Sequence, residues 1–350
     1  MRLPLLLIIS LFSILEINAQ TNTKLNNDID SYISKVQEQY NLPGVALAVI
    51  KNGKIIHKRY YGVANVEYSV LVNENTLFPL FSTTKVFSVI TIHQLIEQKK
   101  MSLENTISDF LDDLPEDWKN VKIKHLLTHS SGLPDIVAYE TDRDEEVAKS
   151  KVYKDSIKFS SGNEFDYNQT NFWVLSRILK KIVGKTLSEY IIETQFPSSK
   201  NLVVFEGNNL KVIQNLSYGY MKRENDNYFL KRNWNFPEYM YGTAGLNLTL
   251  NSFIDWNKKF DEGIFISEVT KKQLLTPFDY KKQRYFCYGL DLIKVNEQTS
   301  YGFSGGVATA FRKFPDKNLT IILLANGMLI PTEKLNGINE VVNNIAIMVN

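Results

Sequence analysis

Cysteine is almost absent from this sequence of 350 residues, with Cys287 as the only example. A single cysteine cannot form a disulfide within the chain, so the stability of the fold must come from a packed core. The length is ample for a large core, in one large domain or in two. Cys287 lies in an aromatic-rich, strand-like run, and we interpret it as a core residue and not as a nucleophile.

An excess of charge of either sign is lacking as well. Lysine and arginine number 40 against 38 aspartates and glutamates, which gives a formal charge of +2 and a pI of about 8.3. This balance gives no reason to expect a nucleic acid as a partner. The sequence also lacks internal repeats and low-complexity segments, and its composition is that of an ordinary globular protein.

Long apolar runs are missing after the N-terminus, so no membrane-spanning segment is expected there. Residues 1–20 differ, because Arg2 precedes an apolar run over 3–15 and Ala19 offers a small residue for cleavage. This pattern predicts a secretory signal peptide over 1–20 and an exported domain over 21–350, periplasmic or extracellular and without stable membrane insertion. A single N-terminal membrane anchor is the alternative, and the shortness of the apolar run disfavours it.

Predicted strands fall at both ends of the chain, with predicted helices between them. Asn52-Gly53 indicates a hairpin near the N-terminus, because this pair tolerates the positive φ of a type I′ turn. We predict an α/β (α+β) fold in which one antiparallel sheet is built from both chain ends, about 21–81 and 245–350, and is flanked by helices. The inserted region, about 82–244, is expected to be mostly helical, and the cleft between the two parts is the natural place for a site.

Periodic apolar patterns and capping residues locate the individual elements. Residues 140–155 are charged and predict an exposed insertion. Residues 198–240 are polar and aromatic without a regular pattern, so no helix or strand is predicted there. The predicted helices cover 28–40, 82–96, 103–114, 172–183, 186–194, 252–260, 267–275 and 338–349, and the predicted strands cover 45–50, 55–61, 285–295, 305–314 and 319–326.

Residues 81–85, Phe-Ser-Thr-Thr-Lys, precede an apolar run that contains neither glycine nor proline, and they predict the start of a buried helix. Ser82 and Lys85 share a face of that helix, because three residues are almost one turn. A serine hydroxyl is a weak nucleophile until a base takes its proton, and an amine sheltered by apolar walls can accept one. One interpretation is therefore a nucleophilic Ser82 activated by Lys85. The alternative is Ser82 as a helix N-cap with Lys85 in solvent.

Several further motifs follow in a fixed order along nearly the whole chain after residue 20. Together they resemble the serine β-lactamase and penicillin-binding-protein superfamily, in particular the class C-like branch with its esterases and D-amino-acid peptidases. The matching stretches are 42–45 with the 52–53 hairpin, 81–85, 124–133, Tyr167 before a helix, 244–246, 288–290 and 304–306.

The resemblance implies a role for each matching residue. Ser82 would be the nucleophile that forms an acyl-enzyme, and Lys85 would tune its proton. Tyr167 would carry protons between the lysine, the serine and the leaving group; its alternative is an aromatic residue packed at a helix start. The oxyanion hole would use the backbone N–H groups of Ser82 and Gly306.

Two positions depart from the family's pattern. Where the family has Tyr-x-Asn, this chain has Gln169, which keeps the amide on a longer arm, and the neighbouring Asn168 is the alternative donor. Where the family has Lys or His before x-Gly, this chain has Phe303, followed by Ser304 and Gly305. Phe303 can neither carry charge nor donate a hydrogen bond. Its presence argues against a substrate carboxylate at that point and favours an uncharged ester or amide.

Two other patterns suggest different chemistry. Residues 302–306 match the Gly-x-Ser-x-Gly elbow of α/β-hydrolases, but that motif requires a following helix and a later histidine. The residues that follow are strand-like, and all four histidines lie upstream. His125 and His129 have a spacing seen in metal sites, yet they lack the carboxylate of His-Glu-x-x-His, so we predict a structural role and no metal.

We therefore predict an exported serine hydrolase that acts through an acyl-enzyme on Ser82 and needs no cofactor. The expected substrate is a small ester or amide, with cell-wall D-amino-acid peptides or β-lactams second. A catalytically impaired, penicillin-binding-protein-like binding protein is the alternative, because of Phe303. The pocket lining is expected to come from 140–165 and 198–240, where the sequence matches no motif.

Overall fold

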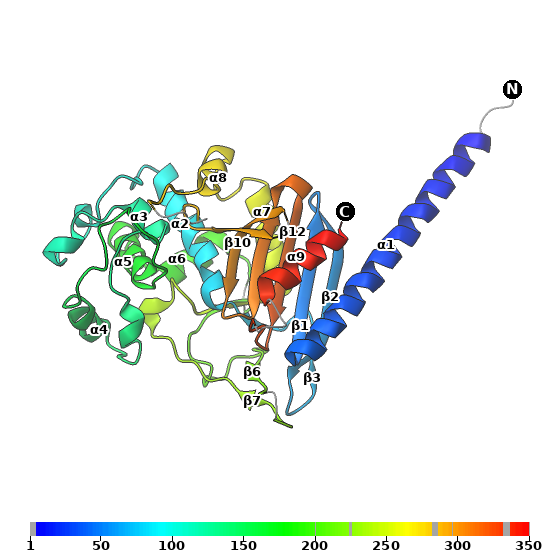
Figure 1. Cartoon of the computed structure of the whole chain (residues 1–350), viewed down its shortest axis with the longest axis horizontal. Coiled ribbons are helices and arrows are strands. Elements are labelled where there is room, and N and C mark those ends of the chain that lie inside the picture. The colour runs from blue at the N-terminus through cyan, green and yellow to red at the C-terminus, as the bar shows by residue number, and fades with distance from the viewer. Residues whose placement is uncertain are drawn as a thin grey trace.

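The computed structural model describes residues 5–199, 201–223, 226–281, 286–295, 297–331 and 337–349, with side chains from residue 23 onward. Its centre is a seven-stranded antiparallel sheet in the order β3-β2-β1-β12-β11-β10-β9 (Figure 1). Val45 of β1 pairs with Ala325 of β12, so the two chain ends meet in the middle of the sheet and the predicted fold class is confirmed. In chain order the strands are β1 (Gly44–Lys51), β2 (Lys54–Asn65), β3 (Val70–Leu71), β9 (Asp291–Val295), β10 (Gln298–Gly305), β11 (Thr309–Phe314) and β12 (Leu319–Ala325).

The sheet separates two apolar cores, because side chains along a strand alternate between its faces. Leu47 points into the smaller core, which helices α1 (Leu5–Tyr40) and α9 (Ile338–Met348) cover. Its neighbour Ala48 points into the larger core, to which α7 (Leu250–Asp261) also contributes. Both terminal helices therefore pack on one face, and the functional region lies on the other (Figure 1).

Helix α2 (Thr84–Glu97) lies at the centre of the helical region, and it is apolar and buried on nearly every side. Gln195, at the end of α6 (Leu187–Gln195), links α2 to α7: its Nε2 donates to the Phe87 carbonyl of α2 at 2.9 Å, and its Oε1 accepts from Trp256 Nε1 of α7 at 2.7 Å. The elements around α2 are α3 (Ile123–Leu127), α4 (Glu145–Val152), α5 (Thr170–Val183), α6, α8 (Glu268–Leu274), the short strands β4 (Phe78–Pro79), β5 (Val203–Phe205) and β8 (Leu246–Leu248), and the pair β6 (Tyr220–Met221) and β7 (Leu230–Lys231).

Three sequence predictions are corrected by the structure. The predicted helix over 103–114 is only a 3₁₀ turn, Ile107–Asp109: a capping box between Thr106 and Asp109 starts it, and Phe110, with a φ of −123°, ends it. The segment over 140–155 is not fully exposed, since α4 buries an apolar side within it.

The predicted strand over 305–314 is in fact the end of one strand and the whole of the next. Gly306 and Val307 both adopt positive φ, +55° and +52°, and turn the chain between β10 and β11. Most of β10 escaped prediction because its sequence is polar. The predicted strand over 285–295 begins outside the described residues. Among the described residues, no helix combines the length and the apolar character that crossing a bilayer requires.

Candidate active site

The turn that carries Ser82 has an unusual backbone. Phe81 adopts a φ of +48°, which is uncommon for an aromatic residue and costs on the order of 1–3 kcal/mol unless its surroundings fix it. The surroundings do so: Thr309 Oγ1 on β11 donates to the Leu80 carbonyl at 2.9 Å and lies 3.0 Å from Thr83 Oγ1. The 3₁₀ turn Phe81–Thr83 leads directly into α2. The sheet thus holds the serine at the mouth of the central helix.

Lys85 is completely buried one turn after Ser82. Its Nζ lies 3.4 Å from Ser82 Oγ and donates to the Thr243 carbonyl at 2.9 Å. No carboxylate in the described part of the chain forms an ion pair with it. The alternative of a capping serine and a solvated lysine is therefore wrong, because Lys85 has no contact with solvent and the Ser82 side chain makes no capping bond.

Aromatic rings surround the amine of Lys85. The Nζ lies 5.2 Å from the ring centroid of Tyr167, 5.5 Å from that of Phe172 and 5.9 Å from that of Phe303. Ring faces stabilise a nearby cation electrostatically, so these rings would stabilise the ammonium that forms when Lys85 accepts a proton.

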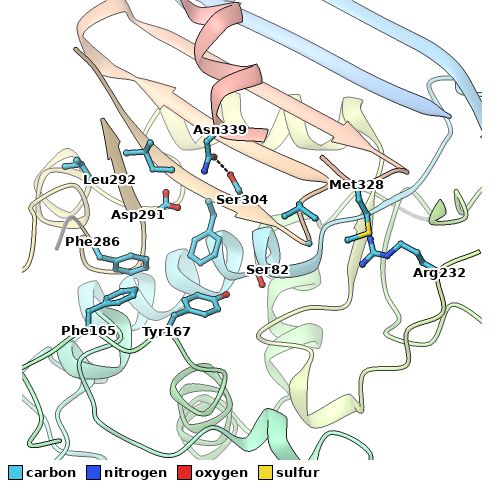
Figure 2. Close-up of a pocket in the computed structure, with 14 residues that line it drawn as sticks. Ser82, Phe165, Tyr167, Arg232, Phe286, Asp291, Leu292, Ser304, Met328 and Asn339 are labelled. Carbon is cyan, nitrogen blue, oxygen red and sulfur yellow. Dashed lines mark hydrogen bonds between the residues drawn. The ribbon is translucent and has the colours of Figure 1, made fainter. Parts of the chain in front are cut away.

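Tyr167 comes from the loop before α5 and is 37% exposed at the wall of the cavity. Figure 2 shows its hydroxyl directed toward Ser82. No hydrogen bond engages that hydroxyl within the described residues, so it is open to a substrate or a water. The structure therefore brings together the three residues that the sequence named: Lys85 Nζ lies 3.4 Å from Ser82 Oγ and 5.2 Å from the ring centroid of Tyr167.

The ring of His129 packs against the ring of Tyr167. Its ring centroid lies 4.4 Å from that of Tyr167. Its Nδ1 accepts from Asn171 Nδ2 at 2.9 Å and from the Asn168 N–H at 3.3 Å, which places the ring proton on Nε2. Burial, together with the nearby Lys85 charge, holds the pKa of His129 well below its usual value. A neutral imidazole with these bonds fixes the loop that carries Tyr167.

The end of β10 comes unusually close to the serine turn. A Cβ on Gly305 would lie 2.3 Å from the Leu80 carbonyl oxygen and 2.9 Å from the Ser82 nitrogen, and a Cβ on Gly306 would lie 2.6 Å from the Phe81 ring. Only glycine permits this approach. Within the described residues, no hydrogen bond uses the N–H of Ser82 or of Gly306. Both predicted oxyanion donors are thus free and close to each other.

The remaining predicted site residues divide between two cavities. Phe303 is buried in the wall between Tyr167 and Phe286, with ring centroids 6.2 and 6.3 Å away. Ser304 Oγ donates to Asn339 Oδ1 at 2.7 Å, at the start of α9 (Figure 2). Ser304 lies on β10, and the next element is the strand β11. The α/β-hydrolase elbow requires a helix after its serine, so that motif is excluded.

Gln169 lines a smaller cavity of about 240 Å³ that also reaches Ser82. The neighbouring Asn168 is buried, and its amide donates to the carbonyls of Leu133 and Asp166 at 3.2 and 3.3 Å. Because these bonds occupy Asn168, Gln169 is the amide that remains available beside the serine.

The larger cavity, about 940 Å³, is lined in part by Phe165 and Arg232, which lie in the ranges 140–165 and 198–240 where the lining was expected. Other lining residues, such as Asp291, Met328 and Asn339, were missed by sequence reasoning. Asp291 forms a buried ion pair with Arg312, while Asn339, Met328 and Arg232 come from three separate segments (Figure 2). No local pattern marks these residues, because only the folded chain brings residues 232, 291, 328 and 339 to one opening. Among the described residues there is no cluster of three His, Cys, Asp or Glu side chains that could hold a metal.

Comparison with known proteins identifies the family of this fold and site. The family model described as Beta-lactamase matches residues 29–339. The chain therefore belongs to the Beta-lactamase family, and the resemblance predicted from the sequence is confirmed.

Curated relatives are distant in sequence. Protein flp of Staphylococcus aureus (strain N315) is 26% identical over 183 residues, which are 48% of this chain and 36% of that protein, so the chain spans little more than a third of flp. Penicillin-binding protein 4* of Bacillus subtilis (strain 168) is 25% identical over 315 residues, which are 83% of this chain and 69% of that protein.

Solved structures share the fold at low identity. A D-amino acid amidase from Ochrobactrum anthropi SV3 in complex with D-phenylalanine superposes with a TM-score of 0.78 at 18% identity, over 93% of this chain and 99% of that chain. EstCE1, described as a hydrolase with promiscuous acyltransferase activity, gives 0.73 at 16% identity, over 95% and 99%. At these identities the likeness concerns the fold.

Proposed function

We propose that this protein is a serine hydrolase that forms an acyl-enzyme on Ser82 and acts on small esters or amides. The observation that carries the proposal is the complete burial of Lys85, with its Nζ 3.4 Å from Ser82 Oγ and no acidic partner among the described residues. Burying an amine without a counter-ion costs folding free energy, and titratable groups in such unfavourable surroundings are concentrated at functional sites.

The reaction follows from the positions of these groups. Ser82 Oγ attacks the substrate carbonyl carbon, and its proton passes to Lys85 Nζ. The oxyanion that forms accepts hydrogen bonds from the N–H groups of Ser82 and Gly306. Tyr167 donates a proton to the leaving group as the carbonyl–heteroatom bond breaks, and it regains a proton from Lys85. A water then attacks the acyl-enzyme by the reverse relay and releases the acid.

The substrate class is supported by the apolar character around Phe303, which offers no partner to a charged group on that wall. The related folds include proteins described as a D-amino acid amidase and a hydrolase with acyltransferase activity, which supports amides and esters as substrates here. β-Lactams are second candidates, since both the family and Penicillin-binding protein 4* are named for them, and D-amino-acid peptides join them because one related fold is described as a D-amino acid amidase.

A catalytically impaired binding protein is the second candidate function, and Phe303 in place of the family's cation is the observation that favours it. An acylating active-site probe separates the two. We expect covalent labelling of the wild type that disappears in Ser82→Ala, and turnover in a screen of p-nitrophenyl esters, nitrocefin and D-Ala-D-Ala peptides. Labelling without turnover on any substrate would favour the binding protein.

We further propose that residues 1–20 are removed on export. The part of α1 that packs on the sheet, with Ile29, Ile33 and Val36 buried, lies after this segment, so cleavage would leave the core intact. The N-terminal sequence of protein recovered outside the cytoplasm of its host tests this: a chain that still contains residues 1–20 would contradict it.

A further inference from the structure

Arg232 is a half-buried guanidinium without an acidic partner. It follows β7 and lines both cavities that meet at Ser82. Only its backbone is bonded, through its N–H to Gly219 and its carbonyl to Asn209. No ion pair or side-chain hydrogen bond engages the guanidinium within the described residues. Burial lowers its pKa, and no neighbouring carboxylate opposes that effect.

Unlike Arg232 and unlike Lys85 beside Ser82, three other sheltered cations have acidic partners within the described residues. Arg312 pairs with Asp291 and Arg177 pairs with Asp113, while Lys313 lies 2.7 Å from Asp261. Withdrawing a guanidinium from water without such a partner is unfavourable, and a carboxylate bound in two parallel hydrogen bonds would offset the cost.

The guanidinium is also held in place. Its Cζ lies 5.3 Å from the ring centroid of Phe81, which Trp234 contacts from another side at a centroid distance of 5.0 Å. A planar cation stacked on a fixed ring is restrained before any ligand arrives, so less entropy is lost on binding. Phe81 is the residue directly before Ser82, which places this cation beside the reacting serine.

Arg232 and Tyr167 lie on opposite sides of Ser82 (Figure 2). If Tyr167 gives its proton to the leaving group, the leaving group occupies the Tyr167 side. The acyl group then extends toward Arg232 and the smaller cavity, where Gln169 and Trp234 also lie.

We propose that Arg232 binds a carboxylate in the acyl part of the substrate and makes the enzyme selective for anionic acyl groups. The inference rests on the proposed acyl-enzyme at Ser82 and names its substrate class. It reconciles Phe303 with an anionic substrate, because the negative charge is recognised by Arg232, across Ser82 from Tyr167, and not by residue 303 on β10.

Two esters with one leaving group test the inference. The mono-p-nitrophenyl ester of glutaric acid carries an acyl carboxylate, and p-nitrophenyl butyrate lacks it. The ratio of kcat/KM for the anionic to the neutral ester is expected to fall at least about tenfold in Arg232→Met, with Arg232→Lys between the two. Arg59→Met, which removes an exposed arginine of β2, serves as the control and should keep the wild-type ratio.

Several outcomes overturn the proposal. An unchanged ratio in Arg232→Met would do so, as would selectivity confined to an anionic leaving group, measured with 4-acetoxybenzoate. Calorimetric titration of Ser82→Ala with methyl hydrogen glutarate distinguishes a failure of the proposed hydrolase from a failure of the proposed anion site. Binding that Arg232→Met abolishes, without turnover by the wild type, would refute the proposed hydrolase and support the anion site, whereas turnover without selectivity would refute the anion site alone.

Discussion

The two walls of the Ser82 cleft contribute different kinds of groups. The helical wall, formed by the start of α2 and the loop before α5, supplies the hydroxyl of Ser82, the amine of Lys85 and the phenol of Tyr167. The strand wall, residues 303–306 of β10 and its turn, supplies a buried phenyl ring and two glycines whose backbone approaches the serine.

This difference indicates that the proposed proton relay depends on side chains of the helical wall, whereas the strand wall acts through its backbone and its shape. The side chains of the proposed proton relay, Ser82, Lys85 and Tyr167, all lie on the helical wall. The strand wall contributes backbone donors and shape, which depend on close approach and not on side-chain charge. A change of side chain on the strand, such as Phe303, can therefore alter the substrate while the proton relay stays intact.

The largest effect is expected when one serine on each wall is replaced by alanine and the two losses of activity are compared. Ser82→Ala is expected to lower kcat by on the order of 10⁴-fold or more, because no nucleophile remains. Ser304→Ala should lose at most about tenfold, since its hydroxyl donates to Asn339. The measurement is steady-state hydrolysis of a p-nitrophenyl ester, and the reverse order of effects would move the nucleophile to the strand wall.

Removing the hydroxyl of Tyr167 tests its proposed role as the proton donor to the leaving group. Tyr167→Phe should lower kcat by about 10²- to 10⁴-fold, because the leaving group loses its proton donor. The loss should shrink for esters with better leaving groups, which depart without protonation. Tyr139→Phe, whose hydroxyl bonds Asp155, is the matched control. A loss independent of the leaving group would contradict the assigned role.

The dependence of thermal stability on pH tests whether the histidines that pack near the helical wall are neutral in the folded protein. Burial lowers the pKa of His129 well below its usual value and, with neighbouring lysines, that of His125 to about 4. The unfolded chain, with ordinary histidine pKa values near 6.5, binds more protons than the folded chain between pH 6.5 and 4. Stability should therefore fall as the pH decreases through this window.

The expected readout is a Tm that drops by several degrees between pH 7 and pH 4.5. In His125→Gln the drop should be smaller, because one of the groups that titrates differently in the two states is gone. A Tm that is constant over this range would show that the histidines are not held neutral.

The smallest effect is expected on the strand wall. Phe303→His introduces a donor that can become cationic, and it should raise kcat/KM for esters with a carboxylate in the leaving group by about threefold to tenfold. Phe286→His adds a similar group to the same cavity but on another segment and is the control. No change in Phe303→His would undercut the interpretation of this position.

The parts of the site that could be predicted from sequence are those with local signatures. Ser82 and Lys85 lie one helical turn apart in a single apolar segment, and Tyr167 directly precedes a strongly amphipathic helix. The antiparallel sheet was predictable for the same reason, since the Asn52-Gly53 turn and the apolar run of β12 each show their structure in a few residues.

What escaped prediction depends on contacts between distant segments. Asn339 reaches the cavity only because the fold brings α9 there. Arg232 lies in the range 198–240 that was expected to line the pocket, but no motif around it marked the individual residue. The helix expected over 103–114 failed because the chain leaves helical geometry at Phe110, directly after the capping box formed by Thr106 and Asp109, in spite of the apolar periodicity. Most of β10 was missed because its polar residues show no alternation.

The central claim is that Lys85 activates Ser82, and the rate of acylation tests it most directly. Wild type and Lys85→Ala would be mixed rapidly with an acylating probe, and the modified peptide identified by mass spectrometry. We expect modification at Ser82 in the wild type, and a rate on the order of 10³-fold lower in Lys85→Ala. Acylation of the variant at a rate near that of the wild type would contradict the account.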